Sequence, residues 1–292
     1  MLRGKSYLVT GSTDGIGRQT ITKLAASGAD VLIHGRNPEK VAALQEHIKA
    51  AGGGGKVSAY TYDLASLAEV RKLAEAVKAE HKRLDVLINN AGIFAKHKTF
   101  SKDGIELTWA VNMLAPFLLT SLLLDTIQER IVNVGSMALA SNMDFDNLQQ
   151  EKGFNGHNAY SVSKLANLMY SVELAPVMKA RSVTVNCVHP GVVATNVLRD
   201  GWGSGGISAE SADDVFKLTT STQLGQQTGR FFAGRGPVQM SAIAKNASAR
   251  QRLWKIMTEQ TNAYTVSERA SYCATLVQVA LFHPFTGCVM QP

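Results

Sequence analysis

The chain has 292 residues, of which 45% are hydrophobic and 18% charged, and this composition excludes a disordered or fibrous protein. Its formal net charge of +7 comes from Lys and Arg residues that are spread along the chain rather than massed in one run. Such a balance suits a phosphorylated small ligand, but it does not indicate nucleic-acid binding.

The first residues, MLRGKSYLVTGS, run directly into an apolar segment and a glycine turn, which leaves no room for the apolar core of a signal peptide. No run of about 18 apolar residues is free of interruptions, so a transmembrane helix is not expected. Cys187, Cys273 and Cys288 show no CxxC spacing and no histidine partners, which predicts a reducing compartment and no metal site. We therefore expect a cytoplasmic protein, with peripheral contact to a membrane left open.

Short apolar runs alternate with longer segments of helical period from residue 5 to about 190. Because helices that cross between parallel strands cover both faces of the sheet, such strands are apolar throughout, as these runs are. The pattern predicts a single α/β domain with a doubly wound Rossmann-type parallel sheet of about seven strands and helices on both faces. The expected strands are residues 7–9, 31–33, 57–62, 86–88, 131–134, 183–188 and 229–233.

Helix signals separate these runs. Asn37 can cap a helix, and Pro38 suits its first turn. Beyond residue 191 the alternation weakens, and helices are expected at 208–221 and 247–260. We expect one domain over residues 1–263 with a substrate loop at about 195–225. The C-terminal tail 264–292 has no assigned role: it could pack on a partner subunit in a homo-oligomer, touch a membrane or be disordered.

A glycine turn follows the first expected strand and opens the first helix. Glycines let the backbone turn tightly and approach a pyrophosphate, whose charge is met by the positive end of the helix. In the context of repeated strand and helix units, this turn predicts a dinucleotide site. The turn consists of Gly11, Ser12, Thr13, Asp14, Gly15, Ile16 and Gly17, and Arg18 follows it.

The end of the second strand indicates which dinucleotide binds. An acidic side chain there would accept hydrogen bonds from the ribose of NAD, but this chain has Arg36 and Asn37. Arg36 could hold a 2′-phosphate, with Arg18 as a second cation. The sequence therefore predicts NADP(H) in preference to NAD(H).

Three side chains suggest acid–base chemistry. Tyr160 and Lys164 are four residues apart and share one face of a helix, so the ammonium can lie near the phenol. A phenol of pKa about 10 exchanges protons poorly at neutral pH unless a neighbouring cation stabilises the phenolate. Ser136 follows an expected strand, at the end of the sheet where open α/β folds bind ligands. A Tyr–Lys pair at this spacing is usually only a pair of neighbours on a helix surface. The position of Ser136 at the ligand-binding end of the sheet is what suggests a catalytic role.

Several motifs occur in the order found in short-chain dehydrogenases/reductases, and residues 5–235 resemble that family. They are TGxxxGIG at 10–17, Asn89-Asn90-Ala91-Gly92, Asn112, Ser136, Tyr160 with Lys164, and Pro190-Gly191 with Thr195. The resemblance implies that Tyr160 is the general acid or base, that Ser136 holds the substrate oxygen, and that Asn112 anchors a water that relays protons to Lys164. It also implies cofactor contacts from Asp63, Leu64, Asn90, Ala91, Gly92, Tyr160, Lys164, Pro190, Gly191, Val193 and Thr195.

Segments 146–148, 159–167, 187–193 and 228–232 resemble the retinol-dehydrogenase-like branch of that family. Substrates in that branch are apolar aldehydes, ketones and alcohols, including retinoids and sterols. The resemblance implies an NADP(H)-dependent oxidoreductase that moves a hydride between the nicotinamide and the carbonyl or alcohol carbon of a small apolar molecule. The alternative is a non-catalytic sensor or scaffold that binds NADPH with the same fold.

Overall fold

A computed structural model describes residues 2–234 and 236–263, so the tail 264–292 lies outside the described residues. Within them, eight strands form one sheet in the order β3-β2-β1-β4-β5-β6-β7-β8. Their bounds are β1 Ser6–Val9, β2 Asp30–Gly35, β3 Val57–Thr61, β4 Leu84–Asn89, β5 Ile127–Val134, β6 Thr184–His189, β7 Phe231–Ala233 and β8 Gly236–Pro237. The pairings among β1 to β7 are parallel, which confirms the predicted Rossmann-type sheet, and the short antiparallel β8 was not expected.

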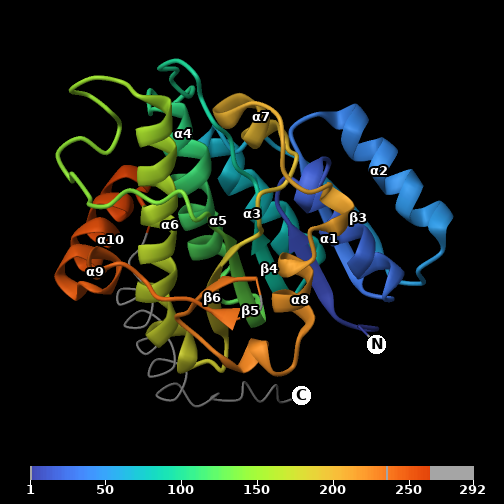
Figure 1. Cartoon of the computed structure of the whole chain (residues 1–292). Helices are drawn as coiled ribbons and strands as arrows, with labels where there is room; N and C mark the ends of the chain where they lie inside the picture. The colour runs from blue at the N-terminus through green and yellow to red at the C-terminus, as the bar shows by residue number, and fades with distance from the viewer. Residues whose placement is uncertain (1, 235, 264–292) are drawn as a thin grey trace, which may run out of the picture.

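Helices cover both faces of this sheet (Figure 1). Their bounds are α1 Gly15–Ala26, α2 Pro38–Ala51, α3 Leu67–Glu80, α4 Leu107–Trp109, α5 Ala115–Leu123, α6 Gly156–Lys179, α7 Asn196–Trp202, α8 Asp214–Thr220, α9 Ala242–Lys245 and α10 Ala247–Thr261. Side chains of β1 alternate between two apolar clusters: Leu8 faces the cluster under α3, α5 and α6, whereas Tyr7 and Val9 face the one under α1 and α2. This two-sided burial explains why the strands read as continuous apolar runs.

Local signals set the helix boundaries. The side chain of Asn37 accepts a hydrogen bond from the Lys40 amide at 2.8 Å, so α2 begins at Pro38 as predicted. Gly52 ends α2 in a left-handed conformation, φ +72°, which glycine adopts without strain. The helix expected at 247–260 is confirmed as α10.

The stretch 208–221 is not the single helix that its pattern predicts. A 3₁₀ turn, Ala209–Ser211, is followed by an extended Ala212 and then by α8. Lys23 of α1 explains the break, because its ammonium donates to the Glu210 carbonyl at 2.9 Å and pairs with the Asp213 carboxylate. The chain turns here to dock on α1 rather than to continue one helix.

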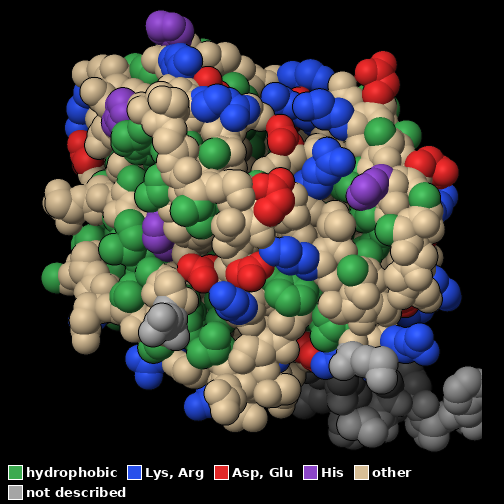
Figure 2. All heavy atoms as spheres, turned by 45° about the vertical axis from the view of Figure 1, so that its right-hand side comes forward, with side chains coloured by type: hydrophobic (Ala, Val, Ile, Leu, Met, Phe, Trp, Pro, Cys, Tyr) green, Lys and Arg blue, Asp and Glu red, His purple; other side chains and the backbone are tan. Residues whose placement is uncertain are grey.

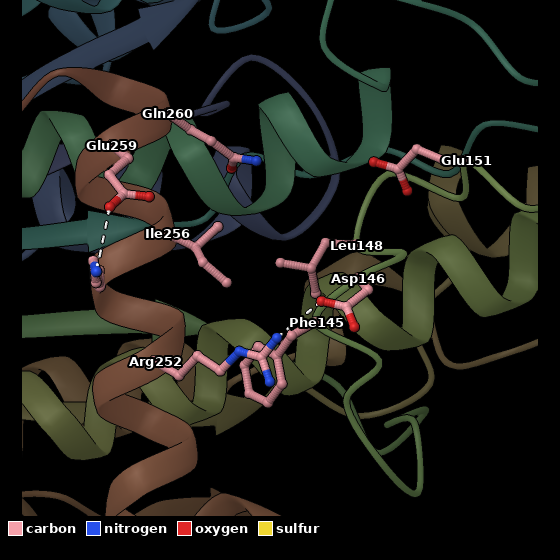
Figure 3. A pocket seen from close by; sticks show the side chains of 9 residues that line it. Phe145, Asp146, Leu148, Glu151, Arg252, Ile256, Glu259 and Gln260 are labelled. Carbon is pink, nitrogen blue, oxygen red and sulfur yellow. Dashed lines mark hydrogen bonds and ion pairs between the residues drawn. The ribbon is translucent and has the colours of Figure 1, made fainter.

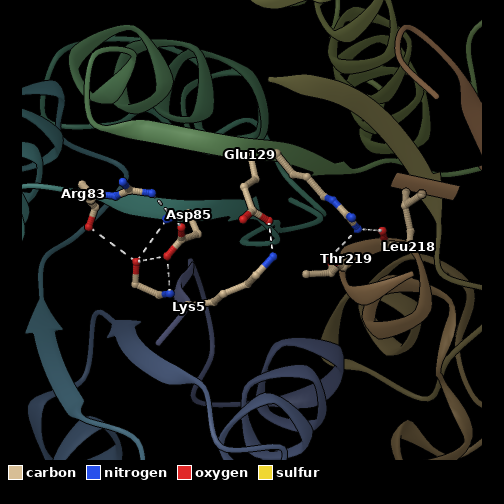
Figure 4. A network of polar contacts seen from close by, with 8 residues as sticks. Lys5, Arg83, Asp85, Glu129, Leu218 and Thr219 are labelled. Atoms are coloured by element: carbon tan, nitrogen blue, oxygen red, sulfur yellow. Dashed lines mark hydrogen bonds and ion pairs between the residues drawn. The ribbon is translucent and has the colours of Figure 1, made fainter. Parts of the chain in front are cut away.

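A polar network joins the amino ends of the central strands (Figure 4). The buried carboxylate of Asp85 on β4 accepts hydrogen bonds from the Ser6 amide at 2.7 Å and from the Ser6 hydroxyl at 2.9 Å. Beside them Lys5 pairs with Glu129 at 2.8 Å, and Arg130 donates to the Thr219 carbonyl at 2.7 Å. The network ties β1, β4, β5 and the end of α8 together, far from the ligand-binding edge expected for such a sheet.

Replacing Asp85 with Ala should destabilise the fold, because it leaves the buried Ser6 groups without their charged acceptor. We expect the free energy of unfolding, measured by urea titration, to fall by about 2–4 kcal/mol. Arg83→Ala is the control: this 70% exposed side chain lies 3.6 Å from the same carboxylate, so its loss should cost less than about 1 kcal/mol. Equal small losses for both variants would contradict a structural role for Asp85.

Candidate active site

A large cleft opens at the carboxyl ends of the strands, where the strand order reverses between β1 and β4. Open α/β sheets bind ligands at this reversal because neighbouring loops part there. The cleft has a volume of about 1220 Å³. Figure 2 shows several Lys and Arg side chains gathered over the upper part of the face on which α2 lies.

Most predicted site residues line this cleft. They are Gly11, Thr13, Asp14, Gly15, Ile16, Gly17, Arg36, Asn37, Asp63, Leu64, Asn90, Ala91, Gly92, Ser136, Tyr160, Lys164, Pro190, Gly191, Val193 and Thr195. Ser12, Arg18 and Asn112 are not on its wall. The Ser12 side chain is buried and accepts from the His34 amide at 2.9 Å, while Arg18 is exposed on α1. The role of Arg18 as a second cation for a phosphate therefore stays a prediction.

The glycine turn needs its glycines. Gly11 and Gly15 have φ of +62° and +49°, which other residues rarely adopt. A Cβ on Gly17 would lie 2.4 Å from the Gly11 carbonyl oxygen, so no side chain fits there. The result is a bare backbone cradle at the start of α1, where amide groups and the helix end favour an anion such as a pyrophosphate.

Asn90, after β4, holds the cradle from behind. Its side-chain amide donates to the Thr10 carbonyl at 2.8 Å and to the Gly11 carbonyl at 3.2 Å. In return, the Thr10 hydroxyl accepts from the amides of Asn90 and Ala91 at 3.0 and 3.1 Å. Asn90 thus fixes the two loops that part at the strand-order reversal.

A basic corner closes one end of the cleft. Arg36 and Asn37 lie there as predicted, together with Lys40 from the first turn of α2. The side chains of Arg36 and Lys40 are exposed, so two cations can meet one phosphate. Lys40 was not identified from the sequence. Its position in the first helical turn after Arg36 could have indicated that the two cations lie close together.

His34 is a second residue that the sequence did not single out. It is 2% exposed, its Nδ1 accepts from the Gly11 amide at 3.1 Å, and its Nε2 donates to the Tyr62 carbonyl at 3.1 Å. Both contacts require the neutral imidazole with its proton on Nε2, because Nδ1 must keep a lone pair for Gly11. Burial also lowers the pKa of His34 to about 4.

Tyr160 and Ser136 meet at the other end of the cleft. Tyr160 lies on α6, and Ser136 lies two residues beyond the end of β5. Burial raises the pKa of Tyr160 to about 12, while a hydrogen bond with the Ser136 side chain acts in the opposite direction. The phenol is therefore protonated at neutral pH.

Lys164 is buried one helical turn after Tyr160. Its ammonium donates to the Val134 carbonyl at 2.8 Å and lies 5.6 Å from the centre of the Tyr160 ring. Burial lowers the pKa of Lys164 to about 8, and the neighbouring Cys187 acts weakly in the opposite direction. The lysine is close to the phenol, as its spacing predicted, but its hydrogen bond goes to the backbone of β5.

Asn112 lies behind this pair in a π-helical turn, Ala110–Leu114, between α4 and α5. Its side chain accepts from the Ile93 amide at 2.8 Å and donates to the Ile93 carbonyl at 3.0 Å and to the Ser163 hydroxyl at 3.1 Å. Such a turn inserts one residue into a helix and is frequent at functional sites. A Cβ on Gly92 would lie 3.5 Å from both the Asn112 oxygen and the Lys164 nitrogen, so all three converge.

The segment after β6 crosses from one end of the cleft to the other. Thr195 caps α7 by accepting from the Leu198 amide at 3.4 Å, and its methyl group would lie 3.0 Å from a Cβ on Gly15. Asn196 donates to the Asp14 carboxylate at 2.9 Å. The predicted residues of this segment therefore lie over the glycine cradle.

Aromatic rings surround Tyr160, and the sequence pattern did not indicate them. Phe94 and Trp202 lie with their ring centres 5.9 and 5.4 Å from that of Tyr160. His157, one turn before Tyr160, contacts both of these rings at 5.0 and 5.2 Å. These rings make the Tyr160 end of the cleft apolar.

A second, smaller hollow lies between α10 and the loop that precedes α6 (Figure 3). Its volume is about 380 Å³, and Leu148 and Ile256 lie in it. Most of its charges pair with one another: Arg252 contacts Asp146 at 2.9 Å and also lies over the Phe145 ring at 4.6 Å, and Lys255 pairs with Glu259. Because these groups already satisfy each other, the hollow is not the candidate site.

Within residues 2–234 and 236–263, no helix combines the length and hydropathy that a membrane span requires. The same residues bring no three His, Cys, Asp or Glu side chains together as metal ligands.

Known proteins resemble this chain over most of its length. Residues 5–202 match the family described as short chain dehydrogenase. Human Retinol dehydrogenase 11 is 36% identical over 270 residues, covering 87% of this chain and 85% of that protein. Mouse Retinol dehydrogenase 14 is 34% identical over 285 residues, covering 88% and 85%.

Solved structures share the fold. A protein of uncharacterized function from Mycobacterium paratuberculosis has a TM-score of 0.76 and 29% identity, covering 90% of this chain and 95% of that one. A short chain dehydrogenase from Burkholderia cenocepacia, solved in complex with NADP, has a TM-score of 0.65 and 28% identity, covering 80% and 96%.

The buried, neutral His34 should make stability depend on pH. The unfolded chain binds a proton at this residue below about pH 6.5, whereas the folded protein resists protonation until its pKa of about 4. Stability is therefore lost as pH falls between these values, by about 2 kcal/mol at about pH 5. Urea unfolding of the protein and of His34→Gln at about pH 7.5 and pH 5 measures this, and an equal pH dependence in both would contradict it.

Proposed function

The chain belongs to the short-chain dehydrogenase family, in its retinol-dehydrogenase-like branch, and on that premise we propose that it is an NADP(H)-dependent oxidoreductase acting on small apolar carbonyl compounds or alcohols. One observation carries the proposal. A single cleft joins a glycine cradle and a basic corner, suited to NADP(H), to the buried group of Ser136, Tyr160 and Lys164.

The residues fit reduction of a carbonyl group. The nicotinamide, when bound, supplies or accepts the hydride. Ser136 holds the substrate oxygen, and Tyr160 gives it a proton, so that hydride and proton together turn the carbonyl into an alcohol. Burial keeps the Tyr160 phenol protonated at neutral pH, and the Lys164 cation would lower the pKa of Tyr160 toward the range in which the phenol gives up its proton efficiently.

Lys164 and Asn112 serve the return of that proton. The Lys164 ammonium lies near the phenol ring, and its pKa of about 8 lets it exchange protons close to neutral pH. Asn112 lies near it, and we propose, from the resemblance, that Asn112 anchors a water that connects the lysine to solvent. In oxidation the same groups act in reverse, with Tyr160 as the base.

The proposed cofactor is NADP(H) rather than NAD(H). Arg36 and Lys40 stand at the end of β2 and the start of α2, where the ribose phosphate of NADP would add two negative charges. No carboxylate replaces them at residues 35–37 to accept the ribose hydroxyls of NAD. The Burkholderia cenocepacia neighbour was solved with NADP, which also supports this choice.

The proposed substrate is apolar. Met137, Val192 and Trp202 line the cleft although they are 55%, 58% and 46% exposed. Exposed apolar side chains gathered at one rim favour an apolar ligand. Because the similar curated proteins bear the name retinol dehydrogenase, the proposed class is a retinal- or retinol-like molecule, a sterol or another apolar aldehyde or ketone. A cytoplasmic location and a homo-oligomer stay predictions.

Tyr160→Phe should keep NADPH binding and lose turnover, because it removes only the proton donor. We expect kcat with NADPH and an active aldehyde to fall by at least about 100-fold, while the Kd for NADPH, followed by its fluorescence, stays within about 2-fold. Tyr170→Phe, a buried change on the same helix, is the control and should keep most turnover. If the unmodified protein binds NADPH but oxidises none with a broad aldehyde panel, the sensor alternative is favoured instead.

Arg36→Asp should weaken NADPH far more than NADH, because it replaces a cation at the phosphate with an anion. We expect the Kd for NADPH to rise by at least about 30-fold and that for NADH by less than about 3-fold. Lys40→Asp should behave like Arg36→Asp, and Arg18→Asp tests the predicted second cation, which does not line the cleft. Equal effects on the Kd of both cofactors would show that Arg36 does not recognise the 2′-phosphate.

A further inference from the structure

The helix α7 lies over the Tyr160 end of the cleft, and Trp202 at its carboxyl end makes ring contacts with Phe94 and Tyr160. None of its seven residues is buried. Polar contacts also hold both of its ends: Asn196 binds Asp14 at 2.9 Å, and Asp200 pairs with Lys96 at 3.2 Å. A short segment that has no buried residue and is held by a few contacts at its ends opens at little cost to the core.

His157 holds the carboxyl end of α7. Its Nε2 donates to the Gly201 carbonyl at 2.8 Å, although the two residues are 44 apart in sequence. This bond requires a proton on Nε2, which the Nε2–H tautomer of the neutral imidazole supplies. A Cβ on Gly201 would lie 2.9 Å from the Phe94 ring, so only glycine lets the backbone come this close.

Trp202 follows directly and stands edge-on to its neighbours. Its plane makes angles of 77° with Tyr160, 61° with Phe94 and 86° with His157. Edge-to-face contacts at such distances are favourable and directional. The indole of Trp202 therefore bounds the cleft beside the Tyr160 ring.

We propose that His157 is a positioning residue and Trp202 a specificity-determining residue. His157 fixes the end of α7 so that the indole stays against Tyr160, and the indole restricts the space beside the phenol to flat substituents. A flat ring can stack or meet these rings edge-on, whereas a puckered ring of the same size is thicker and pushes the indole away. This rests on the proposed function, because it assigns the substrate shape that the Tyr160 end of the cleft accepts.

The activity test compares benzaldehyde with cyclohexanecarboxaldehyde, which differ mainly in ring flatness, using NADPH as donor. We expect Trp202→Ala to lower the kcat/KM ratio of the flat to the puckered aldehyde by about 5- to 10-fold, mainly through KM. His157→Phe, which keeps a ring but cannot donate, should lower the ratio in the same direction. His47→Phe, at an exposed histidine on α2, is the control and should leave the ratio as it is. An unchanged ratio in Trp202→Ala would overturn the specificity role.

A second readout needs no turnover. Trypsin should cut after the exposed Arg199 of α7 at least about 5-fold faster in His157→Phe than in the unmodified protein. His157→Gln should restore protection, because its amide can still donate to the Gly201 carbonyl. Equal cleavage rates in all three proteins would overturn the positioning role. If the unmodified protein reduces neither aldehyde nor any other, the proposed function fails, and cleavage at Arg199 alone then decides the role of His157.

Discussion

Lys164 is buried at the wall of the cleft, and a buried charge is stable only where polar partners meet it. The Val134 carbonyl at the end of β5 is such a partner, at 2.8 Å. This bond ties the middle of α6 to the carboxyl edge of the sheet. Tyr160 lies one turn away on the same helix, and Ser136 lies two residues past Val134. This one hydrogen bond between α6 and β5 therefore helps to hold Tyr160 and Ser136 at the same end of the cleft. Gly92 lies beside this group, since a Cβ there would lie 3.5 Å from the ammonium nitrogen.

The two edges of the sheet have different physical roles. At the amino edge, the Asp85 carboxylate accepts hydrogen bonds from the Ser6 amide and hydroxyl. The Arg130 guanidinium donates to the Leu218 and Thr219 carbonyls near the end of α8. Polar groups paired in this way stabilise the strands and present little to a ligand. At the carboxyl edge, glycines leave the backbone bare, and Arg36 and Lys40 point cations into open space. An anionic ligand is therefore favoured at one edge only.

The substrate end of the cleft is built differently from the cofactor end. The cradle is rigid, because Asn90 and His34 fix the glycine turn from two sides. The helix α7 contributes no buried residue and depends on contacts at its ends, one of them to Asp14 beside the cradle. A ligand that alters the Asp14 contact would also act on α7 and on the ring of Trp202. The cofactor and substrate ends are thus physically connected through one short helix.

The sequence by itself determined the strands, the glycine turn and the Tyr–Lys pair, because these depend on local periodicity and on backbone angles that glycine permits. It did not indicate β8, nor the break before α8, where contacts with another helix decide the conformation. Only the tertiary structure decided that Lys40 lines the cleft and Arg18 does not. In the sequence, Arg18 follows the glycine turn and Lys40 lies shortly after the second strand, so both positions are compatible with a place at the cleft. The tertiary structure also decided that His34 holds the Gly11 amide from 23 residues away. Contacts of this kind join separate elements, and spacing along the chain does not encode their distance in space.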